Sequence, residues 1–280
     1  MGFTIHGNIL IRYIDIPNVT EVRIPDGITR IEEDAFVESH LKSVYIPDTV
    51  TEIGYGAFDS CMFLEKVRLP SNLKVISAGA FEECTSLKHI DLPDGLEKIE
   101  GSAFFNTNIR ELDIPESVRE IGSCAVGTPS NDVDKIILNF YKNQRKTKIL
   151  IEILWLGYTP EYRLLDFFDH PCYEKFSVLE PAYKIQIAVS YYDLDDEIKK
   201  YLKRSIRKAV TLAIDRNDTE LLKILLNTGF VTKKNIDFLI QYAIEFTQKS
   251  HNPECQIILT DYKYQHFMSD TSQINKKLKL

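Results

Sequence analysis

The sequence predicts an α+β protein in which a β-solenoid of short repeated coils is followed by an all-α helical repeat domain. A unit of 22 or 23 residues recurs before residue 130, and apolar residues at helical spacing follow it. Residues 1–130 hold 11 basic and 21 acidic residues, a net charge of −10, whereas residues 131–280 hold 23 and 20, a net charge of +3. We therefore expect two domains, 1–130 and 131–280.

The composition excludes several protein classes. A chain of 280 residues that is 44% hydrophobic and 27% charged is typical of a globular protein and not of disorder or collagen. The longest apolar stretch, residues 149–158, contains Glu152 and is shorter than the roughly 18 residues of a membrane helix. Residues 1–11 lack a signal-peptide pattern, so we expect a cytoplasmic protein, or a surface or secreted one if a leader was removed.

The repeat is marked by prolines at intervals of 22, 23, 23 and 22 residues: Pro25, Pro47, Pro70, Pro93 and Pro115. An Ala-Phe pair keeps the same period: Ala35-Phe36, Ala57-Phe58, Ala80-Phe81 and Ala103-Phe104. Two apolar residues, spaced two apart, precede each proline, and this alternation predicts a short strand. Each unit thus contains a strand, a corner at the proline, a second extended piece and an aromatic turn.

A coil this small cannot bury its own apolar residues, so the coils must stack. Stacking pairs equivalent strands about 4.8 Å apart and aligns the repeated phenylalanines in the interior. Proline after the strand ends the ladder, because it has no N–H to donate. Residues 3–13, centred on Gly7-Asn8, predict a hairpin that covers the first open edge. Val126 stands in place of phenylalanine in the last coil, which is therefore atypical.

The repeat unit resembles a known family. Residues 41–61 read L-x-x-V-x-I-P-x-x-V-x-x-I-G-x-x-A-F-x-x-C, and residues 64–84 repeat the pattern. This unit is similar to the BspA-like (Treponema-type) leucine-rich repeats of bacteria and protists. The resemblance implies a curved parallel-sheet solenoid used for protein binding, in several members as surface adhesins. Ser39 and Thr107 depart from the pattern where Cys61 and Cys84 stand in other coils.

The five cysteines are scattered and form no CxxC pair, which favours free thiols over a disulfide framework or a zinc site. Cys61 and Cys84 occupy equivalent places in adjacent coils, so a disulfide is within geometric reach. Reduced cysteines packed as small hydrophobic residues are the simpler interpretation. Neither form is catalytic.

Residues beside the buried strand positions point outward in two columns along the sheet. We expect them to form the partner-binding face, of mixed charge, which includes Glu21 and these candidates: Arg23, Ser43, Tyr45, Lys66, Arg68, His89, Asp91, Glu111 and Asp113. A solvated sheet face without a partner is the alternative interpretation.

The second half reads as helices. Asp218 can cap a helix over residues 221–226, and Gly229 supplies a left-handed stop. Residues 213–214 recur as 243–244, and residues 220–225 recur as 254–259, which predicts two degenerate helix pairs. These pairs are similar to ankyrin-like repeats, although no T-P-L-H tetrapeptide occurs.

The connecting segment is harder to assign. Residues 136–140 predict either a final strand or an early helix, and residues 148–157 and 163–170 predict helices. Trp155, the only tryptophan, is expected to pack between the halves or within the helical core.

A basic helix face is the one charged cluster that could bind phosphates: Lys199, Lys200, Lys203, Arg204, Arg207 and Lys208. A solvated outer face is the ordinary explanation, and the acidic residues 195–197 balance part of its charge.

Enzymatic motifs are missing from the sequence. No histidine pair has metal-ligand spacing, and no GxxxxGK[ST], GxGxxG or GxSxG occurs. His170 and Cys172 cannot be assigned the geometry of a base and a nucleophile. The sequence therefore predicts a non-enzymatic scaffold that binds a protein partner, without a cofactor, metal or small-molecule substrate. A cell-surface adhesin is the alternative, and a nucleic-acid binder is the third.

Overall fold

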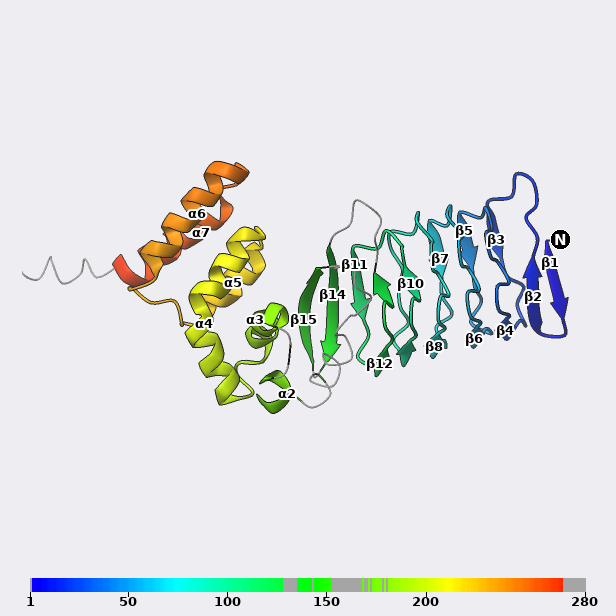
Figure 1. Ribbon diagram of the computed structural model, residues 1–280, viewed down its shortest axis with the longest axis horizontal. Helices are drawn as coiled ribbons and strands as arrows, with labels where there is room; N and C mark the ends of the chain where they lie inside the picture. The colour runs from blue at the N-terminus through cyan, green and yellow to red at the C-terminus, as the bar shows by residue number, and fades with distance from the viewer. Residues whose placement is uncertain are drawn as a thin grey trace, which may run out of the picture. The chain divides into compact units, whose positions relative to one another are not determined.

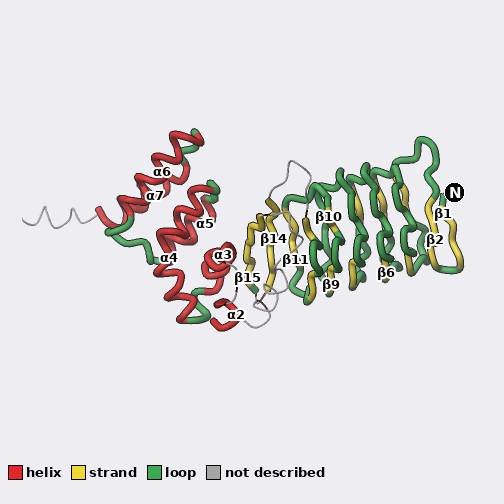
Figure 2. Tube along the Cα trace, in the orientation of Figure 1, coloured by secondary structure: helices red, strands yellow, loops and turns green. Residues whose placement is uncertain are grey.

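The computed structural model describes residues 2–127, 135–142, 144–152, 168, 171, 173–177, 179 and 181–268 (Figure 1). The chain divides into two compact units, residues 1–183 and 184–280. The first is a β-solenoid of about five coils, and the second is helical (Figure 2). The domain boundary predicted at residue 130 lies outside the described residues and stays a prediction.

Two rows of short parallel strands run along the solenoid. The front row begins with β3 (Glu21–Arg23), β5 (Ser43–Tyr45) and β7 (Lys66–Arg68), and in-register pairing aligns Val22, Val44 and Val67. The back row consists of β4 (Arg30–Ile31), β6 (Glu52–Ile53), β8 (Val75–Ile76), β9 (Lys98–Ile99) and β12 (Glu120–Ile121). A short parallel pair, β10 (Phe104–Phe105) and β13 (Val126–Gly127), links the aromatic turns of the last coils.

The predicted row of phenylalanines lies in the core between the coils. Phe36 stacks on Phe58 with ring centroids 4.7 Å apart, and the next two stacks measure 5.2 Å and 5.6 Å. All four rings are buried. Tyr13 extends the row, since its ring stacks on Phe36 at 5.3 Å and its N–H donates to the Ala35 carbonyl. The spacing from Tyr13 to Phe36 is 23 residues, which is the period of the repeat.

Close approach of neighbouring coils explains the glycine of the repeat unit. A Cβ atom on Gly54 would lie 2.6 Å from the backbone nitrogen of Glu33 in the preceding coil. A side chain at this position would therefore force the coils apart.

Antiparallel hairpins lie at both ends of the solenoid. The predicted N-terminal hairpin is confirmed: β1 (Phe3–His6) pairs with β2 (Ile9–Tyr13), and β2 continues the back row beside β4. At the other end, β11 (Glu111–Ile114) pairs in parallel with β14 (Lys135–Lys142), which pairs antiparallel with β15 (Arg145–Glu152).

The second hairpin settles one alternative and corrects one prediction. Residues 136–140 form a strand and not a helix. The helix predicted from residue 148 is wrong over residues 148–152, which belong to β15. The reason is the alternation of exposed Lys146 and Lys148 with buried Thr147 and Ile149, a period of two that suits a half-buried strand. Residues 153–157 and Trp155 lie outside the described residues, as do residues 163–170 apart from Phe168.

The second unit is built from amphipathic helices. Helix α2 (Tyr173–Ser177) lies in the first unit, and α3 (Pro181–Tyr191) crosses the boundary between the units. The second unit continues with α4 (Asp196–Asp215), α5 (Thr219–Asn227), α6 (Ile236–Ser250), α7 (Glu254–Lys263) and the π-helix η1 (Tyr264–Met268). The predicted cap is confirmed, since Asp218 accepts a hydrogen bond from Leu221 N, and Gly229 has a φ of +71° after α5. Helix α4 packs on α5 and α6, and α7 packs on α5 and α6. The ankyrin-like assignment of these pairs stays a prediction.

An acidic row runs along the aromatic turns. Burial raises the pKa of Asp59, with further contributions from the nearby charges of Asp34 and Glu83. Burial likewise raises the pKa of Glu82, and the charges of Asp59 and Glu83 add to it. The folded solenoid therefore disfavours the ionised form of these carboxylates.

The interior stack predicts the cost of truncating one ring. Phe58→Ala should lower the free energy of unfolding by about 3–5 kcal/mol, because it leaves a cavity between two stacked rings. Urea unfolding followed by circular dichroism measures this change. Phe63→Ala is the control, because Phe63 is half exposed, and it should cost less than about 1 kcal/mol. Equal costs for the two variants would contradict the stack as the core of the fold.

The acidic row predicts that removing one of its carboxylates raises the stability of the protein by an amount that depends on pH. Asp59→Asn should raise the thermal unfolding midpoint at pH 7, because it removes a carboxylate whose charge the fold disfavours. Because the pKa of Asp59 is raised in the folded protein, the stability of the unmodified protein increases as the pH falls through that pKa. The difference in unfolding midpoint between the variant and the unmodified protein should therefore shrink in acid. Scanning calorimetry of both proteins across the acid range checks this. An asparagine variant that is less stable at pH 7 would refute the assignment.

Candidate functional site

The outward side chains of β3, β5 and β7, together with those of residues 89–92 and β11 in the next two coils, form the surface that we call the front face. In-register pairing places Ser43 between Glu21 and Lys66, and Tyr45 between Arg23 and Arg68. The two columns therefore lie side by side as the sequence predicted. They expose a mixture of charged, hydroxyl and aromatic groups.

Tyr45 anchors the N-terminal part of the front face. The Cζ atoms of Arg23 and Arg68 lie 3.9 Å and 4.9 Å from its ring centroid, so two guanidinium groups share one aromatic ring. Arg68 is held further by its Nη1, which donates to the Ile46 carbonyl, and by its Nη2, which donates to Asp48 Oδ2, each at 2.8 Å. This cluster, Arg23, Tyr45 and Arg68, is the arginine–tyrosine patch.

The front row is interrupted in the next coil. The repeat places residues 89–91 where β7 has residues 66–68, yet they form no strand, and β11 starts a separate sheet with β14 and β15. Within the described part of the chain, the peptide groups of residues 89–92 form no backbone hydrogen bond. This segment therefore lacks the backbone pairing between coils that β3, β5 and β7 have.

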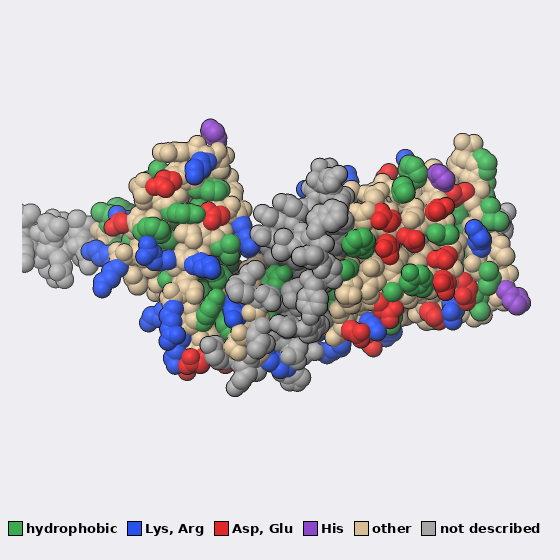
Figure 3. All heavy atoms as spheres, viewed as in Figure 1, with side chains coloured by type: hydrophobic (Ala, Val, Ile, Leu, Met, Phe, Trp, Pro, Cys, Tyr) green, Lys and Arg blue, Asp and Glu red, His purple; other side chains and the backbone are tan. Residues whose placement is uncertain are grey.

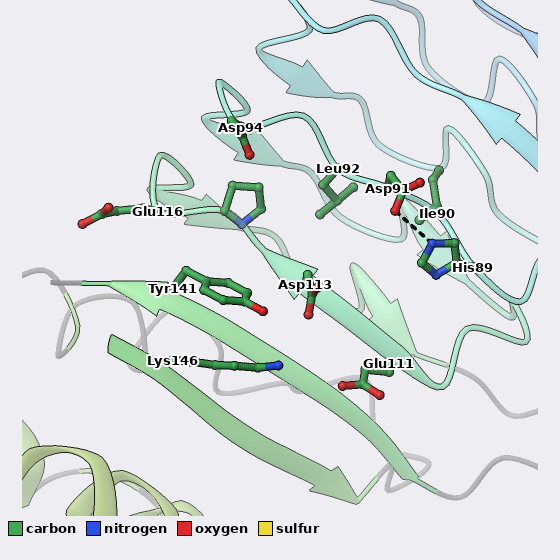
Figure 4. Close-up of a pocket in the computed structure, with 11 residues that line it drawn as sticks. His89, Ile90, Asp91, Leu92, Asp94, Glu111, Asp113, Glu116, Tyr141 and Lys146 are labelled. Atoms are coloured by element: carbon green, nitrogen blue, oxygen red, sulfur yellow. Dashed lines mark hydrogen bonds and ion pairs between the residues drawn. The ribbon is translucent and has the colours of Figure 1, made fainter. Parts of the chain in front are cut away.

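A cavity of about 740 Å³ lies at this interruption (Figure 4). Its lining comes from residues 89–92 and Asp94, from β11 and the two residues after it, and from the β14–β15 hairpin. We call it the acidic groove, because five carboxylates line it: Asp91, Asp94, Glu111, Asp113 and Glu116. His89, Tyr141 and Lys146 are its other polar side chains.

Hydrogen bonds fix the carboxylates of β11. Asn139 on β14 is fully buried, and its Nδ2 donates to Glu111 Oε1 at 2.6 Å and to Asp113 Oδ1 at 2.8 Å. At the opposite wall, His89 Nε2 lies 2.9 Å from Asp91 Oδ1. The carboxylates are thus preorganised and keep oxygen lone pairs for a ligand.

One cation already lies in the groove. Lys146 Nζ is 5.5 Å from the centroid of the Tyr141 ring, and Figure 4 shows the two side chains and Asp113 converging from adjacent strands. Hydrogen bonding to Tyr141 raises the pKa of Lys146, and the charges of Asp113 and Glu111 raise it further. The environment therefore stabilises an ammonium group.

The structure distributes the predicted residues over two places. Arg23, Tyr45 and Arg68 form the patch, Ser43 and Lys66 lie beside it, and the other four predicted residues line the groove: His89, Asp91, Glu111 and Asp113.

Sequence reasoning missed Asp94, Glu116, Tyr141 and Lys146. A signal existed for the first two, because an acidic or hydroxyl residue follows every repeat proline: Asp26, Asp48, Ser71, Asp94 and Glu116. No such signal marks Tyr141 and Lys146, because the pairing of their strands cannot be read from the sequence.

The remaining candidates have structural roles or lie apart. Cys61 and Cys84 are buried free thiols that donate to the carbonyls of Phe36 and Phe58. Interaction with the Cys61 thiol and burial raise the pKa of Cys84, so it is a poor nucleophile at neutral pH. The six basic residues of α4 are all exposed, with Lys200 bonded to Glu197 at 2.5 Å and Arg207 stacked 4.1 Å over Phe238. His170 and Cys172 lie outside the described residues.

Comparison with known families identifies the repeat. Residues 13–128 match the BspA type leucine rich repeat region in six copies. This part of the chain consists of BspA-type leucine-rich repeats. Leucine-rich repeat proteins of this kind are usually involved in protein–protein interaction or adhesion, and their scaffolds are generally non-enzymatic. No curated protein matches the chain.

Solved structures with similar repeats come from bacteria. A leucine rich cell surface protein from Faecalibacterium prausnitzii is 32% identical over 41% of this chain and 34% of its own, with a TM-score of 0.37. The T. pallidum leucine rich repeat protein is 30% identical over 42% and 57%, with a TM-score of 0.36. A Bacteroides ovatus leucine-rich repeat protein is 29% identical over 45% and 38%, with a TM-score of 0.38. The chain thus spans less than two thirds of each of these structures.

Among the described residues, none of the helices combines the length and the apolar character needed to cross a membrane. Nor do the described residues bring together three His, Cys, Asp or Glu side chains in a way that could hold a metal ion.

The patch predicts acid sensitivity through Asp48. Bonds from Arg68 and from the Ser71 N–H and hydroxyl hold the pKa of Asp48 well below its usual 3.8. A lowered pKa contributes stability that is present above pH 3.8 and is lost as the pH falls below it. Asp48→Asn should therefore lower the urea midpoint at pH 7, and the difference should shrink below pH 3.8.

Asp26→Asn is the matched control for this measurement. Asp26 follows the proline of the preceding coil and has one exposed contact, with Arg23 at 3.5 Å. Its removal should change the midpoint little at any pH. A pH-independent difference for Asp48→Asn would contradict the role given to its charge.

Proposed function

We propose that the chain is a non-enzymatic scaffold that binds a protein partner through the front face of its solenoid. The observation that supports the proposal is that contacts within the chain itself hold side chains of the front face in place. Tyr45 and Arg68 are held by ring stacking and hydrogen bonds, and Asn139 holds two carboxylates of the groove. Binding to a preorganised surface costs little ordering entropy, which favours multipoint recognition.

The composition of the front face supports a protein as the ligand. Arginine and tyrosine are the residues that most often dominate binding at protein interfaces, and both meet in the patch. Exposed carboxylates in the groove and exposed guanidinium groups in the patch give the front face ionic groups of both signs. A partner with complementary charges would be bound in one orientation.

A cell-surface adhesin is the second candidate. The solved structure from Faecalibacterium prausnitzii is that of a cell surface protein, and this observation favours the adhesin over a cytoplasmic adaptor. An antibody against the chain, applied both to intact cells of the source organism and to fractions of broken cells, distinguishes the adhesin from the adaptor. Antibody binding to intact cells supports the adhesin, and signal confined to the soluble fraction supports the adaptor.

Nucleic-acid binding through the basic face of α4 is a third and weaker candidate. On the surface in view, Asp and Glu gather over the solenoid coils, and Lys and Arg are prominent on the helices (Figure 3). The net charge of −10 over residues 1–130 repels phosphates at long range. A gel shift with DNA and RNA at moderate salt tests this candidate.

The proposed function predicts the effect of removing the patch. Replacing Tyr45, Lys66 and Arg68 with alanine should weaken partner capture by at least about tenfold, because the aromatic and guanidinium anchors are lost. Partners are captured on the immobilised full chain and quantified by mass spectrometry. Their affinity is then measured with the purified partner.

The matched control replaces the same residue types away from the front face: Tyr55, Lys74 and Arg119. These variants should bind like the unmodified chain, and circular dichroism should show both triple variants to be folded. Unchanged capture by the folded patch variant would remove the patch from the binding surface.

A further inference from the structure

We propose that the acidic groove binds an extended segment of a partner protein that presents a lysine or arginine side chain. This inference rests on the proposed function, since it assigns a ligand chemistry to one part of the front face. Four features of the groove carry it, namely its charge, its internal lysine, its peptide groups without backbone pairing and its size.

The charge of the groove is strongly negative. Five carboxylates face one lysine and one histidine around a cavity of about 740 Å³. The buried Asn139 amide donates to both Glu111 and Asp113, which holds these two negative charges near one another, where they repel. A cation entering the groove relieves that repulsion, which favours an ammonium or guanidinium group over a neutral or acidic one.

Lys146 shows how a cationic side chain fits. Its ammonium group lies beside the Tyr141 ring and is stabilised by Asp113 and Glu111, which is the environment that a partner's lysine would enter. Asp91, Asp94 and Glu116 line the same cavity. The lining of the groove therefore contains more carboxylates than ammonium groups.

The interrupted front row supplies main-chain recognition. Residues 89–92 line the groove, and within the described part of the chain their peptide groups form no backbone hydrogen bond. Peptide groups need partners, and an extended segment offers N–H and C=O groups at strand spacing. A free amine or a metal ion offers no such backbone, so the geometry points to a peptide segment.

The size of the cavity agrees with a few residues of such a segment. Pockets for small ligands range over roughly 300–1,000 Å³, and this cavity falls within that range. The exposed Tyr141 ring, 36% accessible, adds an apolar wall against which the methylene groups of lysine or arginine can pack.

The test titrates the full chain with a short, fluorescently labelled peptide of alternating serine and lysine, followed by anisotropy. Versions with glutamine or glutamate in place of lysine are the ligand controls. We expect the lysine peptide to bind with an affinity that falls as salt is added. The glutamine and glutamate peptides should bind at least about fivefold more weakly.

Variants of the groove should move the affinity in opposite directions. Asp113→Asn with Asp94→Asn should weaken binding of the lysine peptide roughly five- to tenfold, because two attractive charges are lost. Lys146→Gln should raise the affinity for the lysine peptide about two- to fivefold, because a competing cation is removed from the groove. A misfolded groove would not bind more tightly, so the second variant separates recognition from damage to the fold.

Glu33→Gln with Glu38→Gln is the matched control, since both residues are exposed on the aromatic-turn side of the solenoid. It removes the same charge and should leave the affinity unchanged. Equal binding of the three peptides, or equal loss in the control variant, would overturn the inference. Free lysine amide binding as tightly as the peptide would overturn the extended-segment ligand.

The outcomes also separate this inference from the proposed function. If groove variants leave the lysine peptide unaffected while the patch variant still loses its captured partner, the inference fails and the scaffold function stands. If the lysine peptide binds as described but the patch variant captures partners normally, the inference stands and the patch leaves the binding surface.

Discussion

The whole solenoid depends on the inability of one coil to bury its own apolar side chains. Each coil has one or two extended segments of a few residues, so its aromatic ring and its leucines reach the interior only when a neighbour covers them. The stacked rings from Tyr13 to Phe104 and the in-register strands are two consequences of the same packing. The third consequence is functional, because stacking fixes the outward side chains at regular intervals and so creates a rigid front face.

Much of this arrangement could be predicted from the sequence, because the repeat period specifies it directly. The spacing of Phe36, Phe58, Phe81 and Phe104 predicted the interior row, and Asp218 predicted a helix start. The β14–β15 hairpin could not be predicted, since pairing between residues 112 and 138 leaves no periodic signal. Nor could the acidic groove, because residues 88–92 keep the alternation of a strand and the interruption arises only in three dimensions.

The front face carries two clusters of different chemistry, one on the sheet of β3, β5 and β7 and one beside the sheet of β11, β14 and β15. Its patch holds guanidinium groups around a tyrosine, and its groove holds an ammonium group around another tyrosine, Tyr141. In both places an aromatic ring lies beside cations and carboxylates, which keeps the charged groups ordered while exposed. The difference is the balance of charge. The two guanidinium groups of the patch are paired with Asp26 and Asp48, whereas carboxylates outnumber cations in the groove.

The two hairpins limit how far the architecture can grow. The hairpin of β1 and β2 closes the back row before the first coil, and that of β14 and β15 closes the front row after the last. An additional coil at either end would need parallel neighbours in both rows, and one row always presents an antiparallel strand instead. A further coil of the same kind would therefore meet an antiparallel edge strand, β1 at one end and β15 at the other, in place of a parallel neighbour.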